Sequence, residues 1–61
     1  MSLKNARKKF IVYQYGRFIG IFVGYESVVI ATNVSEWQIR KRLEDGQETK
    51  QGYSFDIPVN N

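Results

Sequence analysis

The sequence predicts a small α+β domain whose elements follow the order β-β-α-α-β. Residues 10–23 are dense in β-branched and aromatic side chains around a glycine turn, which is typical of a β-hairpin. Residues 33–46 combine a helix start signal, an amphipathic body and a helix stop signal. Residues 52–57 alternate apolar and polar side chains, which indicates a half-buried strand. We therefore expect a three-stranded antiparallel sheet, made of the hairpin and the C-terminal strand, with a helix-turn-helix unit inserted before the last strand.

The predicted hairpin joins a strand at residues 10–14 to a strand at residues 18–23 through the turn Tyr15-Gly16-Arg17. Gly16 can take the positive φ that such a turn needs. Gly20 interrupts the second strand and is compatible with a β-bulge or a close approach. Both faces of the hairpin are apolar: one carries Phe10, Val12, Phe18 and Phe22, and the other carries Ile11, Tyr13, Ile19 and Ile21.

This two-sided hairpin predicts self-association. The remaining elements of so small a chain can cover one face only. Leaving four large apolar side chains in water forgoes about 1.5–3 kcal/mol each, and apolar burial in a chain this short barely offsets its conformational entropy. We therefore expect a homodimer through the uncovered face, with two basic helices on one surface. The alternative is that Lys and Arg stems from the N-terminal arm cover that face.

Residues 25–32 are ambiguous between helix and strand. Their Val and Ile residues favour a strand by propensity. Tyr25, Val28 and Ala31, however, recur at intervals of three, which suits one helical face, and Asn33 suits the position after a helix end. We interpret the segment as a short helix because a capped helix follows after a brief turn, and two helices joined in this way form a helix-turn-helix unit. If these residues formed a strand, the chain would have no helix-turn-helix unit.

The second predicted helix has defined ends and two distinct sides. Ser35 can accept a hydrogen bond from the N–H of Gln38, at capping-box spacing, and Gly46 can end the helix in the left-handed conformation. Ile39 and Leu43, four residues apart, form a thin apolar side. The opposite side carries Trp37, Arg40, Lys41 and Glu44. A short basic helix is the usual form of a DNA recognition helix; the alternative is a solvated helix whose charges only keep it soluble.

The chain divides into a basic flexible arm over residues 1–9, one domain over residues 10–58 and a tail over residues 59–61. Pro58 marks the end of the last strand because it cannot donate to a sheet. The net charge is +3, from nine Lys and Arg against six Asp and Glu. That balance is compatible with a polyanionic partner, and a basic arm can lie along phosphates or enter a minor groove.

The composition excludes several kinds of chemistry. The chain has no Cys and no His, which rules out disulfides, thiol chemistry, nucleophile–histidine pairs and the usual zinc sites. Ser27, Ser35 and Ser54 lack a recognisable activating partner. We therefore expect no enzymatic activity, no cofactor and no metal site. No apolar run approaches the ~20 residues of a membrane span, so we expect no membrane partner and a cytoplasmic protein, in the host cytoplasm if it is phage-encoded.

Three motifs in this order resemble the nuclease-associated modular domains, which occur with intron-encoded and phage homing endonucleases and on free-standing phage proteins. The motifs are Val12-x-x-Tyr15-Gly16-Arg17-Phe18-Ile19-Gly20-x-Phe22, then Asn33-Val34-Ser35-x-x-x-Ile39-x-x-x-Leu43-x-x-Gly46, then Gly52-Tyr53-x-Phe55. The resemblance implies DNA binding through the second helix, with Ser35 as its cap and residues 36–38 and 40–42 along it. The chain departs from the family at Ser27-Val28-Val29, where Glu-Ala-Ala is usual, at Asn33, where Gly is usual, and at Glu36, which would repel phosphate.

We therefore expect a small protein that binds double-stranded DNA, as a phage-encoded regulator would. The expected contact residues are Lys8, Lys9, Ser35, Trp37, Gln38, Arg40, Lys41 and Arg42. The cations and the N–H groups at Ser35 would hold phosphates, whereas Gln38 and Trp37 would reach base edges. The alternative is a protein-interaction module, for example a small phage inhibitor of a host protein, since apolar patches and exposed aromatics are typical of protein interfaces. Salt dependence separates the two, because only DNA binding weakens steeply with salt.

Overall fold

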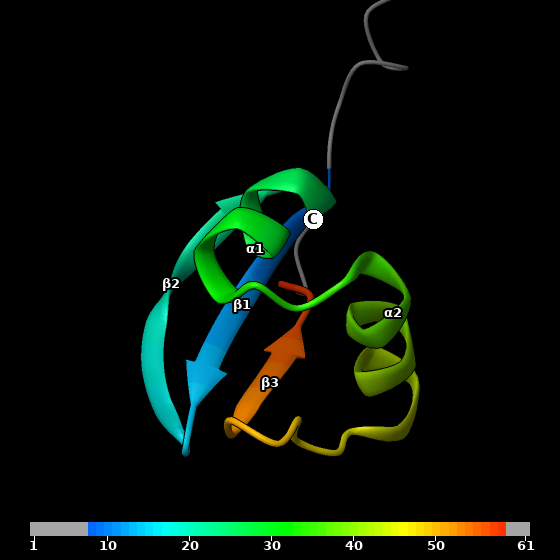
Figure 1. Cartoon of the computed structure of the whole chain (residues 1–61). Helices are drawn as coiled ribbons and strands as arrows, with labels where there is room; N and C mark the ends of the chain where they lie inside the picture. The colour runs from blue at the N-terminus through cyan, green and yellow to red at the C-terminus, as the bar shows by residue number, and fades with distance from the viewer. Residues whose placement is uncertain (1–7, 59–61) are drawn as a thin grey trace, which may run out of the picture.

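The computed structural model describes residues 8–58, and the predicted order β-β-α-α-β is confirmed (Figure 1). The elements are β1 (Lys9–Gln14), β2 (Arg17–Val23), α1 (Gly24–Thr32), α2 (Glu36–Asp45) and β3 (Tyr53–Asp56). The segment that was ambiguous between helix and strand is helical. The flexible arm and the tail expected from the sequence lie outside the described residues, except for Lys8 and Lys9.

The sheet is antiparallel with the strand order β2-β1-β3, so that β1 is central. The hairpin turn has positive φ at both central residues, 51° at Tyr15 and 79° at Gly16, which is the twist that a two-residue hairpin loop needs. Tyr15 is an unusual residue for this conformation. Its backbone N–H donates to the carbonyl oxygen of Gly52 at 2.8 Å, which ties the hairpin turn to the segment that leads into β3.

A β-bulge in β2 changes which residues share a face. Val12 pairs with Gly20, but the next residue of β1, Tyr13, pairs with Phe18, so Ile19 is the extra residue. The sequence-based assignment of Phe18 to the face of Val12 is therefore wrong, because one inserted residue reverses the alternation beyond it. Phe18 instead lies beside Tyr13, with ring centroids 6.3 Å apart.

Both helices pack on one face of the sheet, α1 across β1 and β2 and α2 alongside β3 (Figure 1). The buried core between these layers consists of Phe10, Val12, Val28, Val34, Ile39 and Phe55. We call the opposite side of the sheet the outer face, and its apolar residues on β1 and β2 are Ile11, Tyr13, Phe18, Ile19, Ile21 and Val23. None of the described elements covers this face: Phe18 is 62% exposed and Ile21 is 55% exposed.

The connection between the helices is held by a buried hydroxyl. Thr32 Oγ1 donates to the carbonyl oxygen of Val28 at 2.7 Å and accepts from the N–H of Val34 at 3.2 Å. Asn33 between them takes the left-handed conformation, with φ of 61°, as expected for the residue after a helix end. Within residues 8–58, neither helix has the length and apolarity that crossing a membrane requires.

Replacing Ile39 with Ala should lower the free energy of unfolding by about 2–5 kcal/mol, because the Ile39 side chain is fully buried in the core. The same substitution at Ile30, which is 83% exposed on α1, is the matched control and should change stability by no more than about 0.5 kcal/mol. Urea denaturation followed by tryptophan fluorescence measures both. Equal losses in the two variants would contradict the packing of α2 against the sheet.

Candidate functional site

The two ends of α2 form as the sequence predicts. Ser35 takes an extended conformation, and its hydroxyl accepts from the N–H of Gln38 at 3.2 Å. At the other end Gly46 has φ of 73°, and its N–H donates to the carbonyl oxygen of Arg42. These caps confine the helix to residues 36–45 and therefore set which side chains face the core and which face outward.

The predicted phase of α2 is also observed. Ile39 is buried, and Leu43 is partly buried against the same core. On the other side Trp37 is 67% exposed, and the Lys41 ammonium lies 5.9 Å from the centre of its ring. At that distance the cation and the ring attract one another, so Trp37 and Lys41 present one mixed aromatic and cationic surface.

Arg40 is exposed but already has two partners. Its Nη2 and Nε both donate to Glu36 Oε2, at 2.7 and 3.1 Å, and its guanidinium lies 5.0 Å from the centre of the Tyr25 ring. The hydrogen bond to Glu36 is the main cause that raises the pKa of Arg40, and the charge interaction with Tyr25 adds to it. Glu36, the acid that was expected to repel phosphate, therefore pairs directly with Arg40, the cation at the middle of the helix.

Arg42 does not share the exposed side of α2 with Arg40 and Lys41. Only 20% of its side chain is exposed, and its Nη2 donates to Asp45 Oδ2 at 2.7 Å. Its Nε is buried and has no hydrogen-bond partner among the described residues. Asp45 also accepts from the N–H of Gln47 at 2.8 Å, so this ion pair consolidates the end of α2.

The two lysines predicted to contact DNA lie on different sides of the sheet. Lys9 is the first residue of β1 and pairs with Val23, which places it on the outer face, away from the helices, by the alternation of a strand. Lys8 precedes β1, and its carbonyl oxygen accepts from the N–H of Gly24 at the start of α1. The structure thus brings Lys8, but not Lys9, toward α2.

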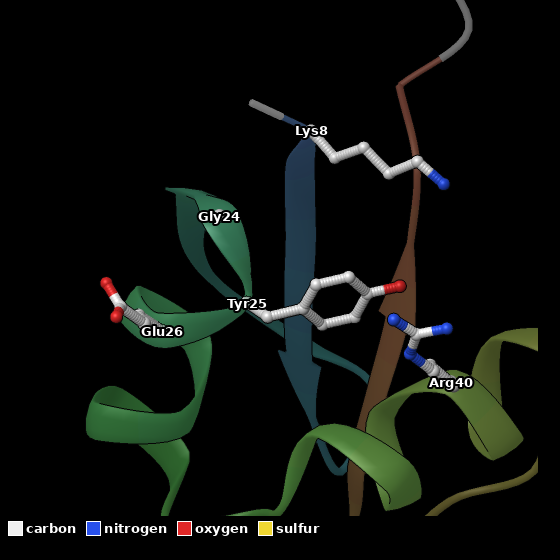
Figure 2. A pocket seen from close by; sticks show the side chains of 5 residues that line it. All are labelled: Lys8, Gly24, Tyr25, Glu26 and Arg40. Atoms are coloured by element: carbon white, nitrogen blue, oxygen red, sulfur yellow. The ribbon is translucent and has the colours of Figure 1, made fainter. Parts of the chain in front are cut away.

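A hollow of about 510 Å³ lies where Lys8, α1 and α2 meet. It is lined by Lys8, Gly24, Tyr25, Glu26 and Arg40, and we call it the Tyr25 pocket (Figure 2). Tyr25 was not among the residues predicted to form a site. Its spacing from Val28 indicated only a helical face, and its approach to Arg40 depends on how the two helices pack.

A second hollow of about 210 Å³ lies at the start of α2. Its lining residues are Asn33, Val34, Ser35, Gln38, Thr49, Lys50 and Gln51. The loop before β3 therefore brings Lys50 close to two residues that the sequence predicted as DNA contacts, Ser35 and Gln38. Sequence reasoning missed Lys50 because it lies in a loop without a motif.

The described residues contain no group of three or more His, Cys, Asp or Glu side chains that could hold a metal ion. Comparisons of the chain with family models, with curated proteins and with solved structures find no match. The likeness to the nuclease-associated modular domains is therefore a resemblance of motif order and spacing, and the exposed side of α2 is the feature of the structure that bears on function.

Replacing Ser35 with Ala should destabilise the protein by about 0.5–2 kcal/mol, because the N–H of Gln38 loses its side-chain acceptor. Ser35→Asp is the matched control, since aspartate is an equally good N-cap residue and keeps a side-chain acceptor for that N–H. Thermal denaturation by circular dichroism compares the two. If alanine and aspartate change the melting temperature equally, the hydrogen bond of the cap does not contribute to stability.

Proposed function

We propose that the protein binds double-stranded DNA, with α2 as the recognition helix of a helix-turn-helix unit. The observation that carries the proposal is the exposed side of α2: Trp37, Arg40 and Lys41 point away from the core and are exposed. A short connection at residues 33–35 joins α2 to α1, and this is the arrangement in which such units present their second helix.

The residues on the exposed side of α2 would have two different roles in DNA binding. Arg40 and Lys41 are placed to neutralise phosphates, which supplies affinity without sequence information. Gln38, near the start of the helix, has an amide that can bond bidentately to adenine in the major groove, and Trp37 offers an aromatic edge next to it. Lys50, at the same end of α2, adds a cation to this surface. Arg42 is not included among the proposed contacts because most of its side chain is covered and its Nη2 donates to Asp45.

Replacing both Arg40 and Lys41 with Ala should weaken DNA binding and make the slope of log K against log salt shallower by about 2, if each cation neutralises one phosphate. The fold should persist, because both residues are exposed. Arg17→Ala, at the hairpin turn and on another element, is the charge control and should retain affinity and slope. Fluorescence anisotropy with a duplex library at several salt concentrations gives both quantities. If the double variant binds DNA with the affinity and salt slope of the wild type, α2 is not part of the DNA interface.

The outer face of the sheet supports a homodimer as part of the same proposal. It exposes a continuous set of large apolar residues on β1 and β2, of which Phe18 and Ile21 are more than half exposed. A patch of this kind on so small a protein marks an interaction surface. A second copy covers it because an identical patch is its apolar complement under two-fold symmetry.

The structure changes what such a dimer can do for DNA binding. Both helices lie on the inner face of the sheet, so two copies joined through their outer faces carry their α2 helices on opposite sides. The expectation that one surface presents both basic helices therefore does not follow from this pairing. Each α2 would bind DNA separately, and the dimer could bridge two duplex segments.

Ile21→Glu should convert the dimer to a monomer, because a carboxylate at the centre of the outer face cannot be buried without a partner. Ile30→Glu, at an exposed position of α1 that faces away from the sheet, is the matched control, and this variant should stay dimeric. Sedimentation equilibrium over a wide concentration range distinguishes a dimer from a monomer, because one chain has a mass of 7.1 kDa. A folded wild-type monomer at high micromolar concentration would rule out the dimer and favour the second candidate function, docking of a different protein on the outer face.

A further inference from the structure

We propose that the Tyr25 pocket is a binding site for a phosphate group, which we call the phosphate seat. It would be occupied by a backbone phosphate of the DNA that lies along α2. This inference rests on the proposed function for the source of the phosphate. The seat itself rests on the three polar side chains that meet there, from Lys8, Tyr25 and Arg40. These residues come from the segment before β1, the first turn of α1 and the middle of α2.

The three side chains converge on one side of the pocket. Figure 2 shows the Lys8 ammonium, the Tyr25 hydroxyl and the Arg40 guanidinium pointing toward the same space, whereas the Glu26 carboxylate lies on the other side of Tyr25. A phosphate group has several acceptor oxygens arranged tetrahedrally. Donors that approach from different directions can each bond a different oxygen, so three donors around one space suit a phosphate.

Tyr25 is held rigidly enough to aim its hydroxyl. Its ring packs against Phe10 on one side, with centroids 4.7 Å apart, and lies under the Arg40 guanidinium on another. Because these contacts occupy the ring, Tyr25 is poorly placed to stack on a base. The hydroxyl is the part of this side chain that the pocket offers, which favours a phosphate over a base as the occupant.

Arg40 retains donors for a phosphate while it is paired with Glu36. A guanidinium has five N–H donors, and Glu36 accepts from Nε and from Nη2, which leaves three. Glu36 nevertheless opposes an incoming anion, because its carboxylate lies against the same guanidinium. Removing the charge of Glu36 should therefore strengthen phosphate binding, although the substitution also removes the ion pair.

Three variants test the seat within the intact chain. Tyr25→Phe removes one hydroxyl and keeps the ring, so it should weaken duplex DNA binding roughly three- to tenfold without changing the salt slope. Lys8→Gln removes a cation and should make the salt slope shallower by about 1. Glu36→Gln should increase DNA affinity. Arg17→Gln, a cation outside the pocket, is the control and should behave as the wild type.

A second measurement separates the seat from the proposed function. Inorganic phosphate is titrated into the protein while NMR follows the Tyr25 ring and the Arg40 side chain, with Lys8→Gln as comparison. Shifts that saturate in the wild type and are lost in Lys8→Gln support the seat, even if no DNA binds and the proposed function fails. If DNA binds through Arg40 and Lys41 but Tyr25→Phe and Lys8→Gln bind it as the wild type does, and phosphate causes no saturable shift, the seat is overturned and the proposed function stands.

Discussion

The connection between the two helices is the constraint on which the rest of the arrangement depends. The Thr32 hydroxyl bonds the end of α1 to the N–H of Val34, and Ser35 then caps α2. Since these bonds fix where α2 begins, they also fix its rotation, with Ile39 inward and Trp37 outward. The buried Thr32 hydroxyl both donates and accepts, so its oxygen is paired although it is covered by the fold, and the two helices are joined by a short connection.

The sheet is covered by the helices on one face only. Its inner face is covered by both helices and holds the core, and its outer face is not covered by any described element. The bulge at Ile19 increases this asymmetry, because it moves the Phe18 ring from the inner face to the outer face. A small domain normally limits such exposure, and the concentration of large apolar residues on one side is the physical reason to regard that side as an interface.

The charges on α2 are balanced rather than purely basic. Glu36 faces Arg40 and Asp45 faces Arg42, while Lys41 lies over Trp37. Exposed ion pairs of this kind are weak in water, so a polyanion can compete for Arg40. Arg42 is different, because most of its side chain is covered. The affinity of this surface for DNA would therefore depend on a few cations, which makes the positions of Lys8 and Lys50 beside α2 important.

The sequence by itself determined the hairpin, α2 and β3, because these depend on local interactions: the turn at Gly16, the cap at Ser35, the helix end at Gly46, and the spacing of Ile39 and Leu43. Residues 25–32 were ambiguous between helix and strand, and their interpretation as a helix depended on the capped helix that follows. The sequence also indicated which side of α2 faces outward. Tertiary structure decided the face of Phe18, the covering of Arg42, the separation of Lys8 from Lys9 and the meeting of Tyr25 with Arg40. These features depend on strand register and on helix packing, in which residues far apart in the chain become neighbours. Local patterns carry no information about such distances, and for that reason the exposed side of α2 could be predicted whereas the pocket beside it could not.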